Sequence, residues 1–196
     1  KVHKLITIGS PHQGVWVLSA DQAVENIPLA GDWLEQRISK KIVDAVNYGK
    51  NQKLDLTATA VKQIYPGSEF LNGYYGINNR VPQDVEYATF YGDIHAEVQR
   101  KLFASVIKTK VSIGDGLIMP ESASGIPGVS PEKHAYSEDT VFNLKLEKIG
   151  TGYALNLEIP NMSLLNAFHT YLPDREDLRK DLACSVKGTS STNDCK

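Results

Sequence analysis

The chain has 196 residues, 41% of them hydrophobic, which suits one globular domain with a core of ordinary size. Its formal net charge is -2 and its Lys and Arg residues are scattered, so we expect no nucleic acid partner and no binding to an anionic membrane. No apolar run approaches the roughly 18 residues of a membrane span, so we expect no integral membrane segment.

The chain opens on a short apolar run, Leu5 to Ile8, which breaks into a loop that contains Gly9, Pro11 and Gly14. This pattern is typical of a buried strand that delivers a loop to a site. Because the strand begins almost at Lys1, we expect further sequence upstream of it.

Helical patterns follow the opening strand. Asp32 is a suitable N-cap for an amphipathic helix that ends at Gly49, with apolar residues at spacings of three and four. A second helix is predicted from Thr57 to Ile64, and Pro66 ends it. A turn and another short helical segment should follow Pro66.

The middle of the chain predicts a strand and then a helix. Val85 to Tyr91 is rich in aromatic and β-branched residues and is closed by Gly92 and Asp93, which predicts a strand. Residues Ala96 to Ile107 place several apolar side chains on roughly one face, which favours a helix.

The last third begins with an apolar stretch, Val111 to Ile118, that Asp115 interrupts between two glycines. Alternating apolar residues in Phe142 to Leu146 and in Tyr153 to Ile159 predict a β-hairpin around the glycines 150 and 152. A charged helix is predicted from Asp174 to Leu182.

Two residues could act as an acid and a base, with the acid first along the chain. Asp115 follows an apolar strand, and its flanking glycines permit a tight turn that presents a carboxylate. His169 lies in a loop before the terminal helix, and an imidazole has a pKa suited to proton transfer at neutral pH. Taken alone, Asp115 is more commonly an ordinary turn residue, and His169 is more commonly a packed or surface residue.

Four dispersed strings together resemble bacterial lipases and esterases of the α/β-hydrolase family: Ile8 to Gly14, Pro66 to Leu71, Gly114 to Ile118, and Phe168 to Pro173. The resemblance implies an α/β fold with a mostly parallel sheet flanked by helices, here with an added β-hairpin, over residues 1–183. It also implies an ester or lipid substrate, an acyl-enzyme intermediate and no organic cofactor. No acidic cluster matches a structural calcium site, so no metal is expected.

The same resemblance assigns roles to individual residues. Asp115 would be the acid and His169 the base of a Ser-Asp-His triad, and His12 would support the site from the loop after the first strand. The loop departs from the family at Gln13, where a basic residue is usual. No serine has glycines two residues away on both sides, as the G-x-S-x-G pattern requires, so the nucleophile should come from a missing N-terminal portion.

Several alternatives remain open. Asp93, which also follows a strand and a glycine, is a rival acid, and His134 is a weaker candidate base, whereas His3 and His95 look structural. In a lipase-like protein the helix that ends at Gly49 falls where a lid or cap is often inserted, within residues 15–80. It is equally interpreted as a helix packed on the sheet.

The two cysteines, Cys184 and Cys195, flank a polar segment, so residues 184–196 are interpreted as a tail closed by a disulfide bond. Closing such a loop stabilises a fold by roughly 3 kcal/mol on the chain-entropy estimate and requires an oxidising compartment. We therefore expect a secreted or periplasmic protein. The alternative is a cytoplasmic protein with two free thiols.

The sequence thus predicts the C-terminal part of a serine lipase or esterase that supplies the acid and the base. Two other functions fit the same fold. One is a binding module that has lost the hydrolase machinery, and the other is an acyltransferase, in which an alcohol other than water accepts the acyl group.

Overall fold

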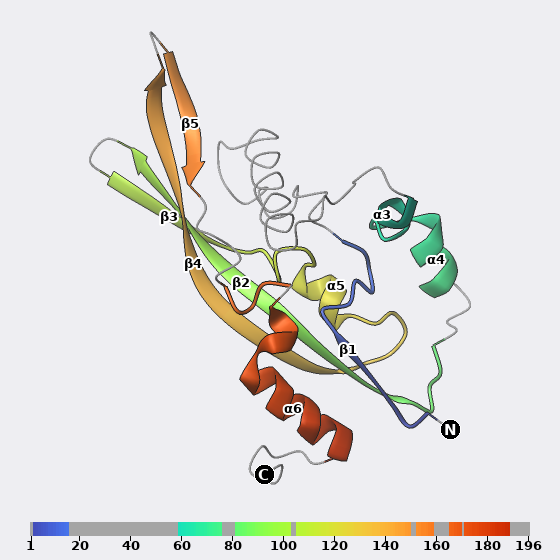
Figure 1. Ribbon diagram of the computed structural model, residues 1–196. Helices are drawn as coiled ribbons and strands as arrows, with labels where there is room; N and C mark the ends of the chain where they lie inside the picture. Colours follow the sequence, from blue (N-terminus) through green and yellow to red (C-terminus); the bar gives the residue numbers. More distant parts are fainter. Residues whose placement is uncertain are drawn as a thin grey trace.

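The computed structural model describes residues 2–15, 59–75, 81–102, 105–149, 152–158, 165–169 and 171–188. A sheet forms its centre, with the parallel strands β1 (Lys4–Ile8), β2 (Glu86–Leu102) and β4 (Glu132–Ile149) in that order. β3 (Ser105–Ser112) pairs antiparallel with β2, and β5 (Gly152–Glu158) pairs antiparallel with β4 (Figure 1). The expected α/β class with a core of parallel strands is confirmed.

β1 and β3 share one edge of β2. β1 pairs with β2 up to Phe90 and β3 pairs with it from His95 onward, while β4 pairs along the opposite edge. Because β1 runs parallel to β2 and β3 runs antiparallel, the C-terminal ends of β1 and β3 point toward each other. The segments that leave these two strands therefore emerge at one place, beside Gly92 of β2.

Short helices surround the sheet, namely α3 (Thr59–Gln63), α4 (Glu69–Tyr75), α5 (Pro120–Ser124) and α6 (Glu176–Lys187), together with the 3-10 turn η3 (Leu172–Asp174). The helix expected before Pro66, the helical segment expected after it and the terminal helix are all present. In the ranges that the structure describes, no helix has the length and apolar character needed to cross a membrane. The amphipathic helix expected to end at Gly49 falls outside these ranges.

The helix predicted from Ala96 to Ile107 is wrong. β2 does not end at Gly92 but continues to Leu102, and β3 follows from Ser105. Backbone hydrogen bonding decides the outcome, since this half of β2 pairs with β3 on one edge and with β4 on the other. Apolar residues at helical spacing were outweighed by strand partners that lie far away in the sequence.

The hairpin predicted near residues 150 and 152 is confirmed. Ile149 of β4 pairs with Gly152 of β5, and the register runs on to the pair of Asn143 and Glu158. β4 is longer than the alternating pattern suggested, because it begins at Glu132. Its first half is a parallel partner of β2, and its second half forms the arm that rises from the sheet in Figure 1.

The core lies between β2, β4 and the C-terminal segment. Four consecutive residues of β2, from Tyr87 to Phe90, are buried, so both faces of this strand are covered. On one face a buried cluster packs together, made of Ala88, Phe90, Tyr136, Leu172 and Leu178. Residues of η3 and α6 thus cover the sheet directly.

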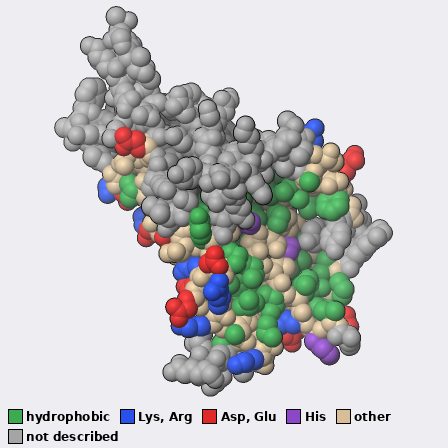
Figure 2. All heavy atoms as spheres, viewed as in Figure 1, with side chains coloured by type: hydrophobic (Ala, Val, Ile, Leu, Met, Phe, Trp, Pro, Cys, Tyr) green, Lys and Arg blue, Asp and Glu red, His purple; other side chains and the backbone are tan. Residues whose placement is uncertain are grey.

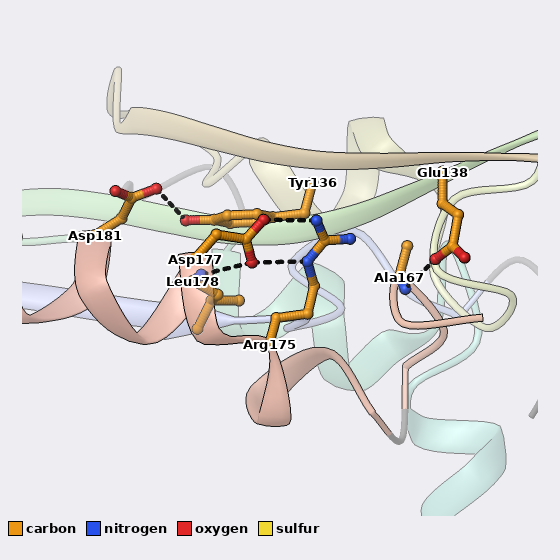
Figure 3. A network of polar contacts seen from close by, with 7 residues as sticks. All are labelled: Tyr136, Glu138, Ala167, Arg175, Asp177, Leu178 and Asp181. Atoms are coloured by element: carbon orange, nitrogen blue, oxygen red, sulfur yellow. Dashed lines mark hydrogen bonds and ion pairs between the residues drawn. The ribbon is translucent and has the colours of Figure 1, made fainter. Parts of the chain in front are cut away.

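Polar contacts fix α6 on this face (Figure 3). The Tyr136 hydroxyl on β4 donates a 2.8 Å hydrogen bond to Asp181, and Arg175 lies over the Tyr136 ring at 5.3 Å from its centroid. Arg175 also donates two hydrogen bonds, of 2.9 and 2.6 Å, to the Asp177 carboxylate. Burial and the hydrogen bond to Asp181 raise the pKa of Tyr136 well above its ordinary value.

α6 extends past the expected domain boundary. It continues to Lys187 and ends at Gly188, whose φ of 71° provides the left-handed cap that glycine favours. The first residues of the expected 184–196 tail are therefore helical. Cys184 is buried and disulfide-bonded, while its expected partner Cys195 lies outside the described residues, so the pairing stays a prediction.

The core predicts a stability difference between two chemically identical substitutions. Phe90→Ala removes a fully buried ring and should lower the free energy of unfolding by about 3 to 5 kcal/mol. Phe70→Ala makes the same change at a side chain that is 53% exposed, and it should cost less than about 1 kcal/mol. Urea unfolding of both variants measures the difference. Equal losses would contradict the described core.

Candidate functional site

Asp115 sits in a turn that requires glycine on both sides. Gly114 and Gly116 have φ values of 58° and 85°, in the left-handed region. A Cβ atom on Gly114 would lie 2.0 Å from the carbonyl oxygen of Ile118, and one on Gly116 would lie 2.5 Å from the Phe168 ring. The glycines therefore allow this turn to fold back on itself and to pack against the loop that carries His169.

The Asp115 carboxylate is fully buried, and both its oxygens have partners. Oδ1 accepts hydrogen bonds of 3.0 and 2.8 Å from the backbone amides of Leu117 and Ile118. Oδ2 lies 2.7 Å from Nδ1 of His169. These contacts offset the cost of removing a carboxylate from water and hold its second oxygen toward the imidazole.

The structure brings Asp115 and His169 together as the sequence predicted. The Asp115 side chain is 0% exposed, whereas that of His169 is 32% exposed. An ionised carboxylate can only accept a hydrogen bond, so Nδ1 of His169 donates and the imidazole lone pair lies on Nε2. A partly exposed imidazole in this tautomer can take up a proton at Nε2 and release it again.

Two further glycines bring the backbone close to this pair. A Cβ atom on Gly9, the first residue after β1, would lie 3.2 Å from both Asp115 Oδ2 and His169 Nδ1. At Gly92 of β2 it would lie 3.0 Å from the Asp115 Cβ atom and 2.2 Å from the carbonyl oxygen of Ala167. The pair therefore lies where the ends of β1 and β3 meet beside β2.

The loop that carries His169 is held by its own backbone. The His169 amide donates a 2.8 Å hydrogen bond to the Asp115 carbonyl, in addition to the side-chain contact. The Ala167 amide donates a 2.9 Å bond to Oε2 of Glu138 on β4. Ala167 and Phe168 are buried, at 0% and 1% exposure.

His12 lies in the loop after β1, buried at 6% exposure. Its Nε2 is 3.0 Å from the Thr7 hydroxyl, and burial lowers the pKa of its imidazole below the ordinary value. Ser122 of α5 holds this loop. Its hydroxyl donates a hydrogen bond to the Gly14 carbonyl and accepts one from the backbone amide of Gln13. Gln13 thus contributes to this contact, because its side chain also donates to carbonyls of residues 121 and 125.

Asp93, the rival acid, is placed in a different contact group. Its carboxylate lies 3.0 Å from Nε2 of His95 and accepts a 2.5 Å hydrogen bond from the Ser112 hydroxyl. His95 also lies 3.6 Å from Asp139 on its other ring nitrogen. These residues tie β2 to β3 and β4, which is the structural role expected of His95.

The remaining histidines lie elsewhere. His134 on β4 stacks on Phe90, with ring centroids 4.4 Å apart, and its Nε2 lies 3.1 Å from Glu132 without hydrogen-bond geometry. His3 is exposed at the start of β1. Within the described residues, no three His, Cys, Asp or Glu side chains form a group that could hold a metal ion.

Sequence reasoning did not identify Gly92, Ser122 or Glu138 as parts of this site. Gly92 carried a usable signal, because an isolated glycine in a strand often marks a close approach of another backbone. Ser122 and Glu138 act through contacts with residues 108 and 29 positions away in the chain. No local pattern announces such contacts.

Comparison with protein-family models, with curated proteins and with solved structures finds no match to this chain. The resemblance to lipases and esterases therefore stays a prediction from the four sequence strings.

The buried imidazole of His12 predicts a pH effect on stability. Its folded pKa lies below the ordinary value of 6.5, so at pH values between these two the unfolded chain binds more protons. The free energy of unfolding should therefore fall as the pH drops from 6.5 through the folded pKa. Urea unfolding across this range, for the wild type and for His12→Gln, measures the contribution.

In His12→Gln this part of the pH dependence should be missing, since glutamine does not titrate. Histidine NMR should show directly that the His12 pKa lies below the ordinary value of 6.5. A His12 pKa at or above that value would contradict the described burial.

Proposed function

We propose that this chain supplies the acid and the base of a Ser-Asp-His triad in a serine carboxylic-ester hydrolase of the lipase or esterase type. The observation that carries the proposal is the 2.7 Å contact between Asp115 Oδ2 and His169 Nδ1. A fully buried carboxylate orients a partly exposed imidazole, and this is the arrangement that general-base activation of an alcohol requires.

In the proposed reaction, Nε2 of His169 takes the proton of a serine hydroxyl while the serine oxygen attacks the ester carbonyl. The imidazolium then gives this proton to the departing alcohol, and an acyl-enzyme remains. Water, activated by the same nitrogen, releases the acid. Asp115 stays ionised throughout; it holds the tautomer and stabilises the imidazolium.

The nucleophile is assigned to sequence outside these 196 residues, because no serine in the chain has the G-x-S-x-G pattern of the family's nucleophile turn. Two features support the finer proposal of an α/β-hydrolase fold. The strands β1, β2 and β4 are parallel, and the acid precedes the histidine along the chain, as in that family.

The described surface includes an apolar area that would suit an ester or lipid substrate. Figure 2 shows a group of hydrophobic side chains exposed together on the face that carries α6 and β1. An apolar surface favours the acyl chain of such a substrate over a charged molecule.

We also propose that the protein is secreted or periplasmic. The support is the disulfide-bonded state of Cys184, since structural disulfides persist in oxidising compartments.

The triad proposal is tested on the full-length protein with a short-chain p-nitrophenyl ester. Asp115→Asn and His169→Ala should each lower kcat by roughly 10⁴-fold, because loss of the acid or the base removes activation of the nucleophile. Asp93→Asn and His134→Ala are matched controls, and each should retain kcat within about threefold. Steady-state kinetics at saturating substrate provide the measurement.

A fluorophosphonate probe tests where the nucleophile lies. It should label the full-length protein at a serine outside residues 1–196, and His169→Ala should slow the labelling. The proposal fails if His169→Ala retains near-normal turnover, or if Asp93→Asn loses as much activity as Asp115→Asn.

A further inference from the structure

We propose that Glu138 is a positioning residue for His169, acting through its hydrogen bond to the Ala167 amide. This inference rests on the proposed function, because it assigns a role within the same acid and base site. Glu138 accepts a hydrogen bond from the backbone two residues before His169, in the loop that presents the imidazole.

Glu138 lies on β4, next to the loop that carries His169. Tyr136 and Glu138 are two residues apart on one strand, so their side chains lie on the same face of the sheet. Tyr136 binds α6 through Asp181, and Glu138 binds the loop before α6 through Ala167 (Figure 3). β4 therefore holds both ends of the segment that contains His169.

Ala167 is held between β4 on one side and β2 on the other. Its amide donates to Glu138 on one side, and on the other side its carbonyl oxygen lies so close to Gly92 that a Cβ atom there would be 2.2 Å away. The residue is 0% exposed. A buried amide that lost its acceptor would be left unsatisfied, so the loop would shift to find another partner.

The position of this loop in turn determines where the His169 imidazole lies. His169 is held to Asp115 at two points, by its amide to the Asp115 carbonyl at 2.8 Å and by Nδ1 to the carboxylate at 2.7 Å. Both contacts depend on where the loop backbone lies. The Glu138 side chain is long enough to place an acceptor oxygen 2.9 Å from the Ala167 amide, and this contact fixes the backbone at that point.

An alternative role for Glu138 would be electrostatic. The pKa of Arg175 is raised mainly by its hydrogen bond to Asp177, and the charge of Glu138 adds to this effect. If the charge of Glu138 were what mattered, Glu138→Asp would behave like the wild type and Glu138→Gln would not. If the reach to the Ala167 amide matters, Glu138→Gln behaves like the wild type and Glu138→Asp does not.

The test therefore compares three variants of the full-length protein. Glu138→Gln keeps the length and an acceptor oxygen but removes the charge, Glu138→Asp keeps the charge but is one methylene too short, and Glu138→Ala removes both. Glu132→Asp makes the same shortening on the same strand, at a carboxylate that pairs with Lys4 instead of with the loop.

Two readouts are measured for each protein. Ester kinetics should show kcat lowered roughly 100-fold in Glu138→Asp and Glu138→Ala, with KM within about twofold, and little change in Glu138→Gln or Glu132→Asp. NMR of ring-¹⁵N-labelled histidine, with the His169 signals identified by their loss in His169→Gln, reports its tautomer. The wild type, Glu138→Gln and Glu132→Asp should hold the single Nδ1-protonated form, whereas Glu138→Asp and Glu138→Ala should show a mixture.

The two readouts separate this inference from the proposed function. If the wild type has no ester turnover, the proposed function fails and the NMR comparison still decides the role of Glu138. The inference is overturned if Glu138→Asp retains the wild-type tautomer and kcat while Glu138→Gln loses them, or if all variants match the wild type. Should Glu138→Ala not fold, the Asp and Gln variants decide the question.

Discussion

The arrangement of the site depends on one buried carboxylate. Asp115 has no exposed surface, and its charge is satisfied by two amides of its own turn and by the imidazole of His169. Such a group is costly to bury unless every contact is present. The turn, the His169 loop and the glycines that let them approach are therefore coupled, since displacing any one of them removes a hydrogen bond from the buried carboxylate.

The sheet explains why these parts meet. β1 and β3 approach along the same edge of β2 from opposite directions, and their ends leave a short gap beside Gly92. Gly9 follows β1 into this gap, and Asp115 enters it from β3. β4, on the opposite edge of β2, provides Glu138 and Tyr136, which hold the histidine loop and α6 from the other side. Residues from β1, β3 and β4 therefore meet around Gly92 of β2.

Much of this could be predicted from the sequence, because local chemistry determines it. The glycines around Asp115 indicated the turn, and the alternating residues indicated the hairpin. The pairing of Asp115 with His169 was predicted only from the resemblance to lipases. The helix predicted after Ala96 failed because strand pairing with distant partners outweighed a local periodicity. Glu138 and Ser122 were missed for a related reason, since their roles exist only after residues far apart in the chain have come together.

The lengths of chain between paired strands bear on how the protein folds. β2 and β3, like β4 and β5, are neighbours in the sequence and pair through short connections. β1 must instead find a partner that lies beyond α4, which is a slower and entropically more expensive search. We therefore expect the projecting arm to form early, while the end of β1 reaches its neighbours late. The meeting place of Gly9, Asp115 and His169 would then be among the last parts of the nascent molecule to form.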